Sequence, residues 1–197
     1  SMILVGHYFV SLPDSSADAQ TYEDEAWQLA KDGFLNVMSH FEGPEPRFIS
    51  WIIAVPYSLF GRSLLMAQSI SLFFGIASVF LGWKLANLLW SPNVANKVGW
   101  TIALFPSLIL YSILVMREVY ISFFLLVALY GVCNWVKTEN IQSIILAMTG
   151  FLCGLFFHGA MIVGAIIFVL IVGINTTKKV YSSLINYKIN FKAMVIF

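Results

Sequence analysis

The chain begins with a long polar stretch and continues as a series of apolar runs. Residues 11–47 are polar, and prolines interrupt them near both ends. Between Thr21 and Asp32 the apolar residues recur at helical spacing, and acidic residues fill the first turn, where the helix dipole favours them. The pattern predicts a short amphipathic helix over residues 21–32 that lies along a membrane surface and ends near Gly33.

The apolar runs predict an all-α, polytopic bundle of transmembrane helices. Crossing a bilayer takes about 20 apolar residues in a helix. The run over 48–61 has only 14 residues and contains Pro56, so we expect it to lie beside the membrane rather than cross it. The run over 141–173 has 33 residues, which is too long for one span, and we divide it at His158–Gly159. The predicted transmembrane helices cover residues 64–90, 98–115, 119–136, 141–157 and 160–174.

The two ends of the sequence suggest a piece of a larger membrane protein. Residues 1–12 are too few to span, and we expect them to be the outer end of a first transmembrane helix. Residues 193–197 resemble the start of a further one. The expectation is therefore a single transmembrane domain over 1–197, in which residues 13–62 form an extracytoplasmic loop with juxtamembrane helices.

Composition agrees with lipid as the main solvent. Hydrophobic residues make up 59% of the chain and charged residues 11%, compared with about 25% charged residues in soluble domains. The net charge of +1 gives no basic footprint for a polyanion, which disfavours a nucleic-acid partner. Cys133 and Cys153 both lie in apolar runs, so we expect small hydrophobic residues there rather than a disulfide or metal ligands.

The charged residues divide between the two faces of the predicted bundle. Seven lysines fall on one face, whereas Lys31 and the three arginines fall on the other, which favours the lysine-rich face as cytoplasmic. Of the ten carboxylates, all but Glu139 then lie in or beside extracytoplasmic segments. We expect the chemistry at that face, because charge and water are available there. If residues 48–61 crossed the membrane, the acidic loop would lie in the cytoplasm instead.

Two loop aspartates are candidates for a general base. Asp18 precedes the amphipathic helix, so it is either a helix cap or loop carboxylate, or a base that takes a proton from an attacking hydroxyl at the lipid boundary. Asp14 follows Pro13 and is either the second candidate or part of a turn.

The other candidates are four basic residues and Glu118, all expected on the same face. Arg117 and Glu118 stand between two predicted helices, either as a phosphate site or as a structural ion pair. His158 is either a phosphate contact or a histidine bonded to a neighbouring helix. Arg47 and Arg62 flank the short helix over 48–61, either as headgroup anchors or as ligands of a lipid-linked phosphate. No spacing of histidines and carboxylates makes a metal motif.

Three stretches in this order resemble polytopic glycosyltransferases of the GT-C fold, in particular bacterial members similar to family 39 and the protein O-mannosyltransferase and aminoarabinose-transferase group. The stretches are DAQTYEDEAWQLAKDGF, similar to the first outer loop of those enzymes; WIIAVPYSLFGRSLLMAQSISLFFG, similar to their short loop helix, turn and next span; and ALFPSLILYSILVMREVYISFFLL, similar to their proline-bearing helix and Arg-Glu pair. The resemblance covers roughly residues 13–130.

The resemblance implies transfer of a sugar from a polyprenyl-phosphate carrier to a glycan, lipid or protein acceptor, with inversion, at the outer face of a bacterial inner membrane. The base of these enzymes corresponds to Asp18, with Asp14 as the alternative, and their Arg-Glu pair corresponds to Arg117 and Glu118. No cofactor is implied with certainty, and a requirement for a divalent cation stays open.

Other function classes remain as alternatives. An envelope polysaccharide polymerase or ligase would share the lipid-linked donor and the topology. A non-catalytic membrane assembly subunit would use the acidic residues only to solvate a loop. A transporter is disfavoured, because no acid or histidine falls at the midplane of the clear spans, where coupling ions bind.

Overall fold

The computed structural model describes residues 18–41, 43–44 and 47–195. The chain divides into two compact units, and the boundary along the sequence follows Met161. Within the described residues all regular structure is α-helical and no strand occurs, which confirms the all-α prediction. The described helices are α2 (Asp18–Ala30), α3 (Phe34–Ser39), α4 (Phe48–Phe60), α5 (Leu64–Leu89), α6 (Pro92–Ala103), α7 (Pro106–Ile113), α8 (Arg117–Thr138), α9 (Ile141–Leu155) and α10 (Met161–Val195).

Within the described residues, three helical segments are long and apolar enough to cross a membrane. They are α5, α8 and the Met161–Lys178 part of α10, and the bent pair α6–α7 makes a fourth if it acts as one span. The chain is therefore an integral membrane protein. The helices α4 and α9 are apolar but shorter than a full span.

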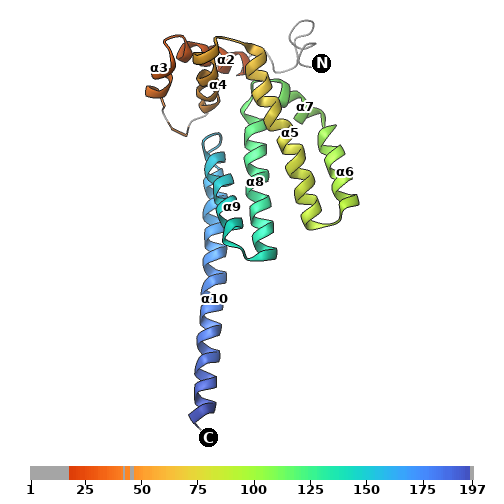
Figure 1. The fold of residues 1–197 in the computed structure, drawn as a ribbon, viewed down its shortest axis with the longest axis vertical. Coiled ribbons are helices and arrows are strands. Elements are labelled where there is room, and N and C mark those ends of the chain that lie inside the picture. The colour runs from red at the N-terminus through yellow and green to blue at the C-terminus, as the bar shows by residue number, and fades with distance from the viewer. Residues whose placement is uncertain (1–17, 42, 45–46, 196–197) are drawn as a thin grey trace. The chain divides into compact units, whose positions relative to one another are not determined.

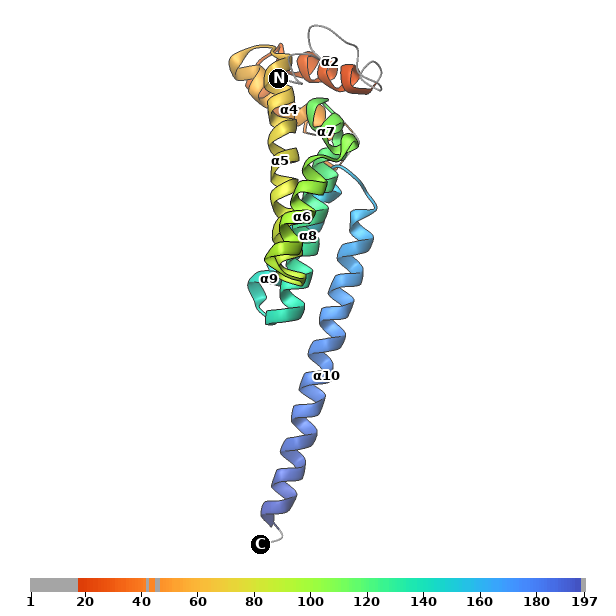
Figure 2. The same ribbon diagram turned by 90° about the vertical axis from the view of Figure 1, so that its right-hand side faces the viewer.

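In the first unit, α2, α3 and α4 lie together at one end of α5 and α8, with α2 running across the α5 axis (Figures 1 and 2). We call these three helices the cap. Small residues of α2, such as Ala26, pack against Ile49 and Ile53 of α4 in a shared core. Gly33, at φ 93°, separates α2 from α3, and this backbone conformation suits glycine. The helix predicted over 21–32 thus begins earlier, at Asp18, and the short α3 is an addition to the predicted elements.

Small residues line the buried side of α5 and let its neighbours approach closely. Buried positions recur every three or four residues, and a Cβ on Gly75 would lie 2.1 Å from Ser112 Oγ in α7. A Cβ on Gly82 would lie 2.4 Å from Ile102 in α6. Helices in lipid associate largely through such close van der Waals packing. The buried positions of α5 are Ala67, Gln68, Ser71, Gly75, Ser78, Gly82 and Ala86.

The region of the span predicted over residues 98–115 is not one straight helix. Residues 92–113 form two helices, α6 and α7, which meet at an angle of 56°. Pro106 is the first residue of α7, and proline favours that position because its missing N–H needs no partner there. The residue before a proline avoids the α-helical region, and Phe105 is indeed extended, at φ −71° and ψ 117°. The bend is thus a local consequence of Phe105–Pro106.

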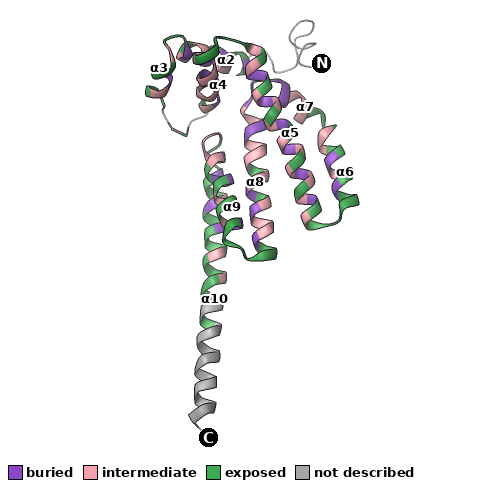
Figure 3. Cartoon of the chain, in the orientation of Figure 1, coloured by how far each residue is buried: buried purple, intermediate pink, exposed green. Residues whose placement is uncertain are grey.

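The hairpin formed by α8 and α9 is held by contacts between small residues. A Cβ on Gly131 would lie 2.4 Å from the Ala147 backbone nitrogen, and one on Gly150 would lie 2.4 Å from that of Ala128. The two helices therefore run antiparallel with their backbones close together, and buried residues recur along both (Figure 3). This register returns the chain after α9 to the end of α8 where Arg117 begins.

The second unit is the rest of α10, a continuous helix through Val195. The predicted helix over 160–174 is therefore too short. Residues 193–195, expected to start a further transmembrane helix, are instead the last turn of α10, and the rest of that prediction lies outside the described residues. The prediction for residues 1–12 also lies outside them.

Candidate functional site

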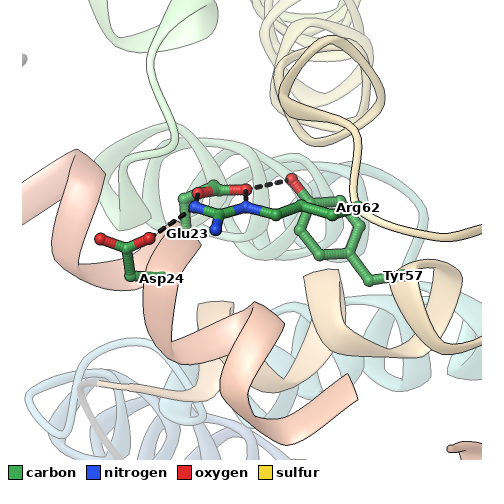
Figure 4. A network of polar contacts seen from close by, with 4 residues as sticks. All are labelled: Glu23, Asp24, Tyr57 and Arg62. Carbon is green, nitrogen blue, oxygen red and sulfur yellow. Dashed lines mark hydrogen bonds and ion pairs between the residues drawn. The ribbon is translucent and has the colours of Figure 1, made fainter. Parts of the chain in front are cut away.

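A buried carboxylate organises the cap. Glu23 of α2 is only 6% exposed, and its Oε1 accepts a hydrogen bond of 2.7 Å from the Tyr57 hydroxyl of α4. Arg62, just after α4, donates to the same oxygen from Nε at 3.0 Å and to Oε2 from an Nη at 2.5 Å. The same Nη donates to Asp24 at 2.5 Å, and Figure 4 shows the four side chains converging. This two-pronged pairing fixes α2 against the end of α4.

The chemistry of the network follows from its burial. Removal from water, and the hydrogen bond to Glu23, raise the pKa of Tyr57 well above its usual range. The hydrogen bond to Glu23 likewise raises the pKa of Arg62. The guanidinium therefore stays charged and the phenol stays neutral. A buried carboxylate with these two donors is a stable structural anchor.

A second ion pair joins the other end of α4 to α2. Arg47, which precedes α4, lies 3.4 Å from Glu25, and Ser50 donates to the other Glu25 oxygen at 3.2 Å. The Arg47 side chain is 72% exposed, so water weakens this pair. Arg47 and Arg62 thus bind neighbouring positions of α2 from the two ends of α4. Since residues at both ends of α4 contact α2, α4 packs along α2 within the cap.

The first turn of α2 packs against the segment that leads into α8. Ala19 is buried together with Leu114 and Met116. One turn further along α2, burial raises the pKa of Tyr22, and the positive charge of Arg117 acts against this rise. The charges of Asp18, Glu118 and Glu25 add to it. Asp18 itself is the first residue of α2 and is exposed. The start of α2 therefore lies within electrostatic reach of the Arg117–Glu118 pair.

Arg117 and Glu118 form a partly exposed pair at the start of α8. Arg117 Nε lies 3.6 Å from Glu118 Oε1, and each side chain keeps about a third of its surface exposed, at 32% and 39%. The other oxygen, Glu118 Oε2, is buried and has no hydrogen-bond partner within the described part of the chain. A buried acceptor without a donor is uncommon in folded proteins. The pair can therefore accept a further donor.

His158 and Arg117 line one small cavity of about 130 Å³. His158 is exposed and stands in the turn between α9 and α10, where its backbone N–H donates to Gly154. Phe157, one residue earlier, stacks on Tyr120 of α8 with ring centroids 5.0 Å apart. This stacking and the α8–α9 register bring His158 to the end of α8. A cavity with a guanidinium and an imidazole suits an anion such as a phosphate.

The predicted site residues fall into two groups in the structure. Arg117 and His158 line one cavity, and Glu118 pairs with Arg117. Asp18 does not line that cavity, but the next residue, Ala19, is buried with Leu114 and Met116, just before α8. Arg47 and Arg62 instead pair with carboxylates of α2, and this pairing uses donors that were expected to hold a phosphate. Asp14 lies outside the described residues.

Sequence reasoning overlooked the central role of Glu23. It assigned Glu23 to the acidic first turn of a surface helix, yet this carboxylate is buried against Tyr57. The helical period could have indicated its burial, because Glu23 is spaced four residues from Ala19 and seven from Ala30, on the buried face of α2. A charge within an apolar stripe requires a partner, and the basic residue that follows α4 supplies it.

No group of three or more histidine, cysteine or carboxylate side chains in the described residues could hold a metal ion. Comparison of the chain with family models, with curated proteins and with solved structures gives no match.

Proposed function

We propose that this protein is a membrane glycosyltransferase that moves a sugar from a polyprenyl-phosphate carrier to an acceptor at the extracytoplasmic face of the bacterial inner membrane. The observation that carries the proposal is the cavity shared by Arg117 and His158, together with the packing of Ala19, next to Asp18, against Leu114 and Met116 just before Arg117. It supplies two groups that bind an anion and one nearby carboxylate, at one end of the membrane helices.

Each residue has a separate role in the proposed reaction. Asp18 takes the proton from the acceptor hydroxyl, whose oxygen attacks the anomeric carbon. The bond from that carbon to the phosphate oxygen breaks, and the phosphate leaves with the bonding electrons. Arg117 and His158 stabilise the charge that develops on the phosphate. Glu118, with its buried free oxygen, orients Arg117 or accepts a hydrogen bond from the substrate. Attack opposite to the leaving phosphate inverts the anomeric centre.

A second candidate is a non-catalytic assembly subunit of the cell envelope. The ion pairs of Arg47 and Arg62 favour it, because they give most charges of the cap a structural role. An envelope polysaccharide polymerase or ligase would use the same lipid-linked donor, but it would depend more strongly on Arg117 and His158 than on Asp18.

The test is turnover of a polyprenyl-phosphate sugar by the purified protein in lipid nanodiscs. We expect Asp18→Asn to lower kcat at least 100-fold, in line with the contribution of a general base. The control Asp32→Asn removes an exposed carboxylate just after α2 and should leave kcat unchanged. Arg117→Ala should also lower kcat, by a smaller factor, because the charge that develops on the phosphate loses one partner while His158 remains.

Three outcomes separate the candidates. Loss of turnover in Asp18→Asn with a smaller loss in Arg117→Ala supports the transferase. The reverse order of losses supports the polymerase or ligase. If neither variant changes binding or turnover of the donor, the proposed site is wrong and the assembly subunit is favoured.

A further inference from the structure

The cap contains a cavity of about 490 Å³ that the proposed transfer site does not use. It lies between α2, α4 and the segment that follows α3, and its volume falls within the range of about 300–1,000 Å³ that is typical of small-molecule sites. The residues that line it are Thr21, Asp24, Glu25, Gln28, Leu29, His40, Phe41, Gly43, Arg47, Phe48, Ser50 and Trp51.

One wall of this cavity is a set of aromatic rings in fixed orientations. Trp51 stacks on Phe48 with centroids 5.6 Å apart and an angle of 11° between the rings. Phe41 meets Trp51 edge to face at 5.1 Å. The indole N–H of Trp51 donates to the Val37 carbonyl at 2.8 Å, so the indole cannot rotate without losing this bond. The wall is a preformed apolar surface.

The polar residues of the cavity are also held in place, and their charges are balanced. Glu25 is held by Arg47 and Ser50, and the Asp24 carboxylate is held by Arg62. Gln28 Oε1 accepts a hydrogen bond of 2.7 Å from Lys31, which directly follows α2. Both carboxylates thus have a guanidinium partner. Among the described residues, the lining offers hydrogen-bond donors and acceptors together, and the charges of Asp24 and Glu25 are balanced by Arg47 in the lining and by Arg62 outside it.

We propose that this cavity binds a saccharide. A pyranose ring has an apolar face of C–H groups that packs on an aromatic ring, and hydroxyls around its edge that both donate and accept hydrogen bonds. The aromatic wall suits the first property, and the carboxylates, the amide and the guanidinium suit the second. The balanced charge favours a neutral polyol over an ion.

The cavity of the cap and the smaller cavity of Arg117 and His158 are neighbours. Phe48 belongs to the aromatic wall of the larger one and lies 4.9 Å, centroid to centroid, from Phe156. Phe156 lines the smaller cavity with Arg117 and His158. In the proposed reaction the larger cavity holds the acceptor glycan beside the donor phosphate. This acceptor role rests on the proposed function, whereas the binding of a saccharide does not.

Saturation-transfer NMR on the chain in nanodiscs of deuterated lipid tests the binding. The probes are the methyl glycosides of glucose, galactose and mannose in solution, and a monoglucosyl diacylglycerol in the disc. Irradiation of the aromatic protons should transfer saturation to the ring protons of at least one sugar. Transfer to a free glycoside identifies a soluble glycan as the ligand, and transfer to the glycolipid alone identifies a lipid headgroup.

Matched variants locate the site. Gln28→Ala and Phe41→Ala remove one polar and one aromatic group of the cavity, and each should weaken binding at least fivefold. The controls are Gln20→Ala and Phe60→Ala, which remove exposed side chains of the same types from α2 and α4 away from the cavity lining. All four variants should keep the wild-type Tm in the nanodisc. The proposal is overturned if no probe receives saturation in the wild type, or if cavity and control variants bind alike.

The two proposals fail separately. Asp18→Asn should keep full saccharide binding, because Asp18 does not line the larger cavity. Binding without any effect of Asp18→Asn on turnover would remove the transferase proposal alone. Turnover that depends on Asp18, without binding in the cavity, would remove the saccharide site alone.

Discussion

The cap and the α8–α9 hairpin are stabilised in opposite ways. The cap joins its helices through charged and aromatic side chains, such as Glu23, Arg62 and Trp51. The hairpin joins its helices through residues with almost no side chain, at Gly131 and Gly150. The cap holds its charges at one end of the spans, whereas the hairpin lies among helices that are apolar enough to cross lipid.

The difference shows how the surroundings select the packing. At a boundary with water, an ion pair is tolerable because water solvates its exposed parts, and it fixes one orientation of the helices. Within lipid, apolar side chains gain little from leaving the solvent, so close contact between backbones becomes the main attraction. The stability of the cap should therefore depend on pH and salt, and the stability of the hairpin mainly on the volume of the side chains between its helices.

The largest expected effect is in the hairpin. Gly131→Ala places a methyl group 2.4 Å from the backbone of Ala147, which cannot move aside as a flexible side chain could. We expect a loss of about 3 kcal/mol in the free energy of unfolding, measured in mixed micelles. The control Gly173→Ala adds the same methyl group where nothing lies within 4 Å, and it should not destabilise the protein. Equal stability of the two variants would contradict the close packing of α8 on α9.

The next effect is in the cap. Glu23→Gln removes the charge that Tyr57 and Arg62 share, and we expect a loss of about 2 kcal/mol in the free energy of unfolding. The loss stays below that of a fully buried pair because the Arg62 side chain is 42% exposed. The matched change Asp32→Asn, at an exposed carboxylate, should cost less than about 0.5 kcal/mol. If both changes cost the same, the Glu23 network does not stabilise the cap.

A smaller effect concerns Tyr57 and depends on pH. Tyr57→Phe loses one hydrogen bond and should cost about 1 kcal/mol near neutral pH. The folded cap raises the pKa of Tyr57, so its contribution is complete below the ordinary tyrosine pKa of about 10 and is lost as the pH rises further. Between neutral and strongly alkaline pH, the Tm of the wild type should therefore fall more steeply than that of Tyr57→Phe. If the Tm of the two proteins falls in parallel with rising pH, ionisation of Tyr57 does not contribute to the loss of stability.

The smallest effect is at the exposed ion pair. Arg47→Ala should lower the free energy of unfolding by only about 0.5 kcal/mol, and high salt should remove the difference. A chemical denaturation series at two salt concentrations measures this. A loss above about 1.5 kcal/mol that persists in salt would mean that Arg47 is as important to the cap as Glu23.

Several features of the fold were predictable because they depend on neighbours in the chain. The length of the apolar run in α5 and the shortness of the run in α4 follow from hydropathy alone. The break at Pro106 was visible in the sequence, but a hydropathy pattern does not distinguish a straight span from two helices at 56°. The short helix α3 was not predicted, because six residues are too few to show a helical period in the hydrophobic pattern.

The candidate site was predictable in part. Arg117 and Glu118 are consecutive residues, so their proximity was predictable, and the turn at His158 follows from the length of the last apolar run. That His158 shares a cavity with Arg117 depends on the register of α9 against α8, which two glycines set through space. The engagement of Arg62 by Glu23 joins residues 39 positions apart, which no local pattern specifies.

By itself, the amino-acid sequence determined that this protein is helical and is embedded in a membrane, because hydropathy and helical period are properties of consecutive residues. Only the tertiary structure decided which carboxylate is buried, which arginines are already paired and which residues line each cavity. These depend on distances between side chains from different helices. Such distances follow from how the helices pack, and a single apolar or charged residue is compatible with many packings.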